Sequence, residues 1–190
     1  MSRQLVAAGL LLLAALPAAA IDYVQTSGST LGFSGIWQGE RFEGRFPGFA
    51  TRLAFDPAKP SAARLDVEIR IAAATAGTPE EDLELRGKAF LDAARHPAAR
   101  YVARGFRATG PGRYTAVGTL SLRGVTRPVT FNFRWTPGAK PLLVGTAMVK
   151  RLQFGVGAGE WADVGVLGND IAVHARVVLT PVAASAKKRP

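Results

Sequence analysis

Apolar and polar side chains alternate with a period of two along several segments of this chain. From Leu65 to Ile71, aliphatic residues alternate with acidic and basic ones. The segments 129–135 and 171–179 repeat the pattern, the first with two phenylalanines and a tryptophan. Because successive side chains of a strand point to opposite faces, this pattern predicts strands with one face buried and the other in water.

Other segments carry a less regular strand signal, and turn residues separate them. Clusters such as Gly110-Pro111-Gly112 and Thr136-Pro137-Gly138 favour chain reversals. Many short strands at this spacing indicate an antiparallel barrel or sandwich. The less regular candidates are 30–37, 41–46, 51–55, 101–107, 114–122, 142–149 and 151–156.

One interruption of the strand pattern reads as helical. Thr78 stands where an N-cap is expected, Pro79 follows at the first helical position, and Glu81 completes a capping box. This arrangement predicts a short helix that runs toward Arg86. A further helical turn is expected over residues 92–96, before Pro97. The sequence therefore predicts one domain, a barrel with one helical insertion.

The first twenty residues differ from the rest of the chain. A basic start precedes an apolar run from Leu5 to Leu16, and Ala18 and Ala20 supply the small residues of a signal-peptidase site. The run is shorter than the roughly 20 residues that span a bilayer, so a membrane anchor is the less favoured interpretation. We expect a signal peptide over residues 1–20, a barrel domain over 21–182, a basic tail over 183–190, and a periplasmic location.

The net charge of +10 raises the question of nucleic-acid binding. The arginines, however, are scattered singly, and only Lys187-Lys188-Arg189 form a cluster. This distribution argues against a nucleic-acid partner and leaves transient contact with an anionic membrane surface as the more credible electrostatic interaction. A homodimer is an assembly that the sequence neither predicts nor excludes.

Residue types needed for common catalytic and metal sites are scarce. The chain has no cysteine and two histidines, which excludes thiolate chemistry and leaves little for a metal. The acidic cluster 80–84 fits the first turn of a helix better than a catalytic carboxylate pair. We therefore expect no enzyme, no catalytic residues, no metal and no cofactor, with an unrecognised hydrolase as the minor alternative.

A set of motifs recurs in a characteristic order along the chain. The most specific is the run Leu120-x-Leu122-Arg123-Gly124-Val125-Thr126-Arg127-Pro128-Val129, followed by Arg151-x-x-Phe154-Gly155. Weaker ones are Phe42-x-Gly44-x-Phe46, Phe55-Asp56-Pro57, Phe90-Leu91-Asp92 and His96-Pro97. Together they resemble the YceI-like family of exported, polyisoprenoid-binding, lipocalin-like proteins, over about residues 23–181. The resemblance implies an all-β, eight-stranded antiparallel lipocalin-like barrel with a short helical insertion, whose apolar lumen binds an isoprenoid lipid without catalytic residues or a metal.

Aromatic residues on or near the predicted strands are the candidates for contact with such a ligand. An eight-stranded barrel has room for packed side chains or for one slender ligand, so these residues either line a tunnel or fill a core. Residue patterns alone favour the filled core, whereas the resemblance favours the tunnel. The candidates are Phe33, Trp37, Phe106, Phe131, Phe133, Trp135, Phe154 and Trp161.

Two functions follow from this choice. The first is a periplasmic carrier that holds a long isoprenoid lipid, polyprenyl or quinone-like, in the lumen. The alternative is an exported structural or stress-response barrel with a filled core and a protein partner. On the first reading, Phe133→Arg should abolish lipid binding, while Arg134→Glu on the opposite face should change little.

Overall fold

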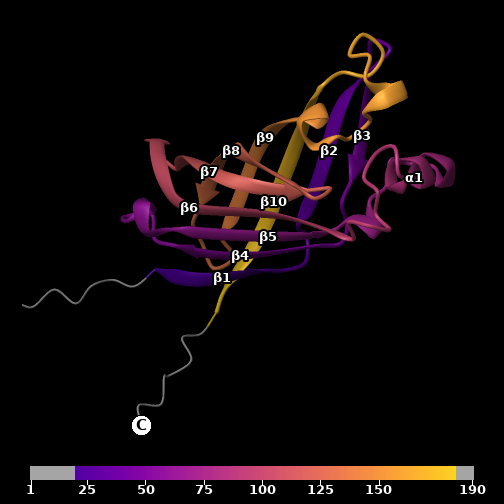
Figure 1. Cartoon of the computed structure of the whole chain (residues 1–190). Helices are drawn as coiled ribbons and strands as arrows, with labels where there is room; N and C mark the ends of the chain where they lie inside the picture. Colours follow the sequence, from indigo (N-terminus) through magenta and orange to yellow (C-terminus); the bar gives the residue numbers. More distant parts are fainter. Residues whose placement is uncertain (1–19, 183–190) are drawn as a thin grey trace, which may run out of the picture.

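The computed structural model describes residues 20–182 (Figure 1). The expected basic tail, and all of the expected signal peptide except Ala20, lie outside these residues. The first strand begins at Ile21, directly after the predicted cleavage site. Cleavage there would remove no part of the described fold.

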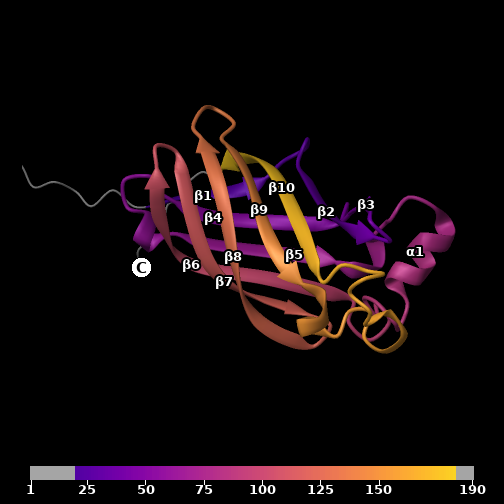
Figure 2. The same cartoon turned by 90° about the horizontal axis from the view of Figure 1, so that it is seen from above.

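The described residues form a closed antiparallel barrel. Eight strands follow one another in the order β1-β4-β5-β6-β7-β8-β9-β10, and pairing between β1 and β10 closes the circle (Figure 2). The hairpin of β2 and β3 is added on β10. This arrangement confirms the eight-stranded barrel. The strands are β1 (Ile21–Gln25), β2 (Thr30–Trp37), β3 (Glu40–Arg45), β4 (Phe49–Phe55), β5 (Arg64–Arg70), β6 (Ala98–Gly110), β7 (Arg113–Leu122), β8 (Val125–Thr136), β9 (Leu142–Lys150) and β10 (Asp170–Pro181).

The two ends of the barrel differ because β10 changes its partner along its length. Near its end, β10 pairs with β1, which in turn pairs with β4, so the wall is continuous there. Earlier in β10, the partner is β2, followed by β3. Among the described residues, the outer edge of β3 meets the rest of the wall through an isolated bridge between Arg45 and Thr75. The barrel is therefore closed at the β1 end and open beside β3.

Helix α1 (Pro79–Arg86) lies at the open end, on the side of β3 (Figure 1). The predicted capping box is present: the Glu81 N–H donates to Thr78 Oγ1 at 3.3 Å, and the Thr78 N–H donates to Glu81 Oε2 at 3.1 Å. None of the helix residues is buried. Arg86 ties the helix to the barrel, because its Nε donates to the Ala74 carbonyl at 2.7 Å.

One predicted strand needs correction, and one strand was not predicted. The strand predicted over residues 151–156 is a 3₁₀ helix, η3 (Arg151–Phe154), which ends at Gly155 in the left-handed conformation. The helical turn expected over residues 92–96 is present as a single hydrogen-bonded turn, in which the N–H groups of Arg95 and His96 donate to the Asp92 carbonyl at 3.0 and 2.9 Å. Strand β1 was not among the candidates, since it is short and adjoins the predicted signal peptide.

Interior side chains form two clusters, one at each end. We call the aromatic one the closed end. Its central residue, Phe55, is fully buried, and its ring centroid lies 5.1 Å from those of Tyr114 and Trp135. The other cluster, which we call the cavity end, is mainly aliphatic and includes Leu31, Ile69, Ile71, Leu91, Leu120, Val129 and Val149.

Candidate functional site

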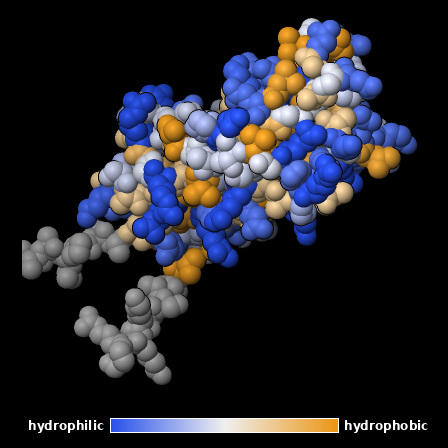
Figure 3. Space-filling model, viewed as in Figure 1, coloured by the Kyte–Doolittle hydropathy of each residue, from blue (hydrophilic) through white to orange (hydrophobic). Residues whose placement is uncertain are grey.

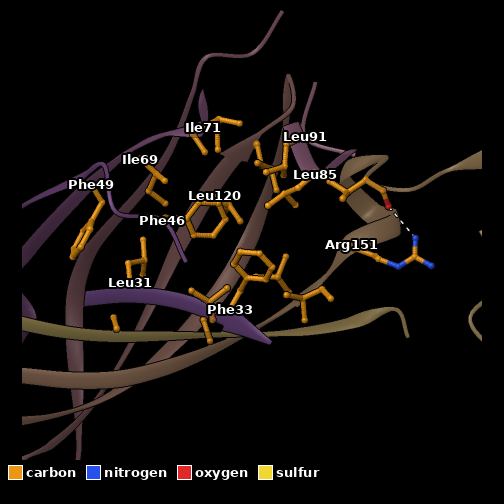
Figure 4. Close-up of a pocket in the computed structure, with 18 of the residues that line it drawn as sticks. Leu31, Phe33, Phe46, Phe49, Ile69, Ile71, Leu85, Leu91, Leu120 and Arg151 are labelled. Carbon is orange, nitrogen blue, oxygen red and sulfur yellow. Dashed lines mark hydrogen bonds between the residues drawn. The ribbon is translucent and has the colours of Figure 1, made fainter. Parts of the chain in front are cut away.

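The cavity end surrounds a hollow of about 640 Å³, a volume typical of small-molecule sites. Its wall is built mainly from inward-facing positions of the barrel strands. Figure 4 shows apolar side chains from several elements directed toward one another around it. The outer surface, by contrast, is mainly hydrophilic on the face that Figure 3 displays. Aliphatic and aromatic residues dominate the wall, among them Leu31, Phe33, Phe46, Phe49, Ile69, Ile71, Leu120, Val149 and Val173.

Small side chains at interior positions leave this space open. Ala99 on β6, Ala147 on β9 and Ala175 on β10 all line the cavity. Farther along β6 and β10, the interior positions hold Phe106 and Leu179, which are buried at the closed end. The hollow therefore results from the volume of the interior side chains, and a register shift between Ala103 and Phe106 keeps Phe106 on the inner face of β6.

Tyr101 and Phe131 lie where the cavity meets the closed end. The Tyr101 hydroxyl lies 3.2 Å from the carbonyl oxygen of Ala116 and 3.1 Å from that of Val129. Burial raises the pKa of Tyr101 to about 12, so the hydroxyl keeps its proton near neutral pH. This group therefore serves as a fixed hydrogen-bond donor to the barrel wall and offers no acid–base chemistry.

The mouth of the cavity lies between β3 and α1. Four carboxylates from these two elements border it, together with Arg41, whose Nε donates to Glu43 Oε1 at 3.0 Å. Trp37 also borders the mouth, and its ring centroid lies 5.1 Å from that of Trp161. The four carboxylates are those of Glu40, Glu43, Glu81 and Glu84.

Arg151 is the one charged residue of the cavity wall that is buried, with 3% of its surface exposed. Burial lowers its pKa, and no ion pair in residues 20–182 involves it. Figure 4 shows its guanidinium directed away from the apolar side chains. Its stem therefore lines the cavity, while its head fixes the loop after η3. All five N–H groups donate over 2.6–3.0 Å to backbone carbonyls, those of Val156, Gly157, Trp161, Leu167 and Gly168.

The eight aromatic candidates separate into two groups. Phe33, Trp37 and Phe131 line the cavity. The other five lie outside its wall, so only the first three are placed to contact a ligand in this cavity. Phe106, Phe133 and Trp135 fill the closed end, Phe154 is buried in the aliphatic cluster, and Trp161 packs against Trp37 and Phe90.

The aromatic candidates omit most of the cavity wall. Its aliphatic residues lie on the same alternating strand faces that predict the barrel, for example Val67 on β5 and Val173 on β10. Their inward direction was predictable, but the empty space in front of them was not. Leu85 and the two glutamates of α1 reach the mouth only through the tertiary position of the helix.

The histidines and carboxylates of the described part of the chain are not arranged as a metal site. No group of three or more such residues is placed to hold an ion there. His174 lies on the outer face of β10, as its place in the alternation predicts, with Nε2 3.0 Å from Ser34 Oγ. Over residues 20–182, no helix has the length and apolar character that a membrane crossing needs.

The geometry defines a class: a closed, lipocalin-like barrel with an apolar cavity that opens at one end. The model of the YceI-like domain matches residues 23–179, so the chain belongs to the YceI-like family. Among curated proteins, it is 35% identical over 107 residues to a UPF0312 protein of Azotobacter vinelandii and 39% identical over 107 residues to one of Shewanella denitrificans. These matches cover 56% of this chain and 53% of each relative, so the chain spans about half the length of the curated relatives it matches.

Solved structures share the fold. BcnA of Burkholderia cenocepacia has a TM-score of 0.78 at 26% identity, with 82% of this chain and 98% of that one covered. The Campylobacter jejuni YceI protein has a TM-score of 0.64 at 20% identity, covering 74% of this chain and 84% of that one. A polyisoprenoid-binding domain from Saccharophagus degradans has a TM-score of 0.67 at 13% identity, covering 86% and 99%. The last two likenesses support the barrel fold alone.

Proposed function

We propose that the protein binds a long isoprenoid lipid, tail first, in the cavity and carries it in the periplasm. The observation that carries this proposal is the apolar hollow of about 640 Å³ in an otherwise packed barrel. Each methylene group buried there contributes roughly 0.8 kcal/mol, so an enclosed tail needs few polar contacts. Membership of the YceI-like family and the polyisoprenoid-binding domain of the structural neighbour support this choice of ligand.

The volume of the cavity limits the length of tail that it can enclose. At the ~0.75 packing density of protein interiors, about 640 Å³ has room for roughly four to six isoprene units. Affinity should therefore rise with each added unit up to this length and then level off. Units beyond it extend through the mouth between β3 and α1 into water and add little.

The family and the structural neighbours suggest a binding protein rather than an enzyme. The cavity wall supports this, because its charged groups are confined to the mouth and to Arg151, whose donors are all engaged.

The expected signal peptide supports the periplasmic location. Arginines on the outer faces of neighbouring strands, such as Arg113 opposite Arg134, are suited to transient contact with anionic lipids.

The test is to purify the exported protein without detergent and to analyse it by denaturing mass spectrometry. A non-covalently held isoprenoid is expected in the extract. The intact mass of the protein should correspond to a chain that begins at Ile21. Stripped protein should also take up added isoprenoid alcohols of increasing length, with the levelling described above. If neither native nor added isoprenoids bind, the structural barrel with a protein partner becomes the better interpretation. A mature form that retains Leu5 to Leu16 would indicate an anchor instead.

A further inference from the structure

The charged groups around the mouth are unevenly paired. Glu43 is matched by Arg41 at 3.0 Å, and Glu81 is held in the capping box of α1. Glu40 and Glu84, from opposite sides of the mouth, take part in none of the ion pairs found in residues 20–182. The border of the cavity therefore carries an excess of negative charge, although the chain as a whole has a net charge of +10.

Two arginines near the mouth are already engaged. Arg86 pairs with Asp82 at 2.8 Å, and Arg123 donates to the carbonyls of Lys88 and Gly155. Arg151, the buried cation of the cavity wall, has all five N–H groups on backbone carbonyls. An anionic head group entering here would meet four carboxylates and, among the cations of the wall, only Arg41 at the mouth, which is already paired through its Nε with Glu43.

We propose that the mouth selects isoprenoid lipids by the charge of the head group, accepting uncharged and cationic heads and rejecting phosphate and diphosphate. This inference rests on the proposed function, because the tail must occupy the cavity for the head to lie at the mouth. Like charges repel and opposite charges attract across the mouth, and salt screens both effects because the mouth is open to water. The tail supplies affinity, and the four glutamates decide which heads are tolerated.

The experiment compares three ligands with one C20 tail: geranylgeraniol, geranylgeranylamine and geranylgeranyl diphosphate. Each competes, below its micelle concentration, with one uncharged fluorescent prenyl probe on lipid-free protein. At low ionic strength the amine should bind at least as tightly as the alcohol, and the diphosphate at least about tenfold more weakly. The gap between alcohol and diphosphate should shrink several-fold as salt rises toward about 1 M.

Variants test whether the glutamates cause the gap. The double variant Glu40→Gln with Glu84→Gln should narrow the difference in affinity between the alcohol and the diphosphate several-fold, while the affinity for the alcohol stays the same. The matched control replaces Glu68→Gln on β5 and Glu80→Gln on α1, which are exposed and do not line the cavity, and it should keep most of the gap. The charge reversal Glu40→Lys with Glu84→Lys should bring the diphosphate close to the alcohol.

The outcomes separate the two proposals. If wild-type protein binds the diphosphate as tightly as the alcohol, head-group selection is wrong while the lipid cavity stands. A gap that survives in the Gln double variant and in high salt would also overturn the selection by charge. If none of the three ligands displaces the probe and the probe itself does not bind, the proposed function fails.

Discussion

The closed end and the cavity end are built from the same strands yet have opposite interiors. On β6 the inward-facing position 99 is alanine at the cavity end and position 106 is phenylalanine at the closed end. On β8 the corresponding residues are Val129 and Phe133. Both ends keep apolar side chains on the inner face of the wall, on β6 through a register shift between Ala103 and Phe106. The comparison teaches that the fold is set by which positions are apolar, whereas the cavity is set by how large those side chains are.

The largest expected effect comes from matched leucine truncations at the two ends. Leu53 is 2% exposed in the closed end, and Leu120 is 9% exposed and borders the cavity. Leu53→Ala should cost about 4 kcal/mol of unfolding free energy, because close-packed neighbours cannot fill the gap. Leu120→Ala should cost about 2 kcal/mol, since its side chain already faces empty space on one side. Urea denaturation of lipid-free protein measures both, and equal losses would contradict the contrast between the ends.

The next prediction compares the replacement of two alanines by phenylalanine, one at each end of the barrel. The first replacement should affect stability and the second ligand binding. Ala116 is fully buried in the closed end, whereas Ala147 lines the cavity. Ala116→Phe should overpack its site and cost about 1–3 kcal/mol or more. Ala147→Phe should fit into the hollow with little change in melting temperature and lower isoprenoid affinity at least about tenfold, by removing space for the tail. Normal lipid uptake by Ala147→Phe would show that the ligand lies elsewhere.

Much of the fold was predictable because it depends on local patterns. Strand β2 occupies the predicted residues 30–37, and the helix begins at the predicted cap, Thr78. The segment after Lys150 was not predictable in this way. Its Leu152 and Phe154 suit a strand, but the Arg151 guanidinium binds carbonyls up to 17 residues away, and this requires a compact loop.

The site was predictable only in part, for a different reason. Alternation shows which side chains face the interior, and it placed Phe131 and Phe133 on the same inner face correctly. It does not show which interior positions are opposed by another side chain and which by empty space. Phe131 borders the cavity and Phe133 is surrounded by closed-end rings, although only one residue lies between them. The effect of Phe133→Arg is therefore expected mainly on stability rather than on ligand contact.

This neighbouring pair provides a smaller and sharper test. Phe131→Leu enlarges the cavity near its inner end, and it should shift the preferred isoprenoid length or the amount bound. Phe133→Leu should change the bound lipid much less, because the Phe133 ring lies outside the cavity wall, packed against Phe106 and Tyr114 and stacked on the far side of Phe131 at 5.5 Å. Each should cost roughly 1 kcal/mol in stability. Mass spectrometry of extracted lipid distinguishes them, and a change of ligand with Phe133→Leu alone would move the site toward the closed end.

The smallest effect concerns Thr51, which lies on β4 in the cavity wall beside Leu53 of the closed end. The residue is 3% exposed, and its Oγ1 is buried without a hydrogen-bond partner among the described residues. A buried hydroxyl that lacks a partner loses its hydration without compensation. Thr51→Val keeps the shape of the side chain and removes this cost, so the free energy of unfolding should rise by about 1 kcal/mol.

The exposed Thr119→Val on β7 is the control and should stay within about 0.5 kcal/mol of the parent protein. Urea denaturation of lipid-free and lipid-loaded protein gives both values. A loss of stability for Thr51→Val in both forms would show that the hydroxyl is hydrogen-bonded within the folded protein. A loss confined to the loaded form would place a polar group of the ligand at this depth, contrary to a head group held at the mouth.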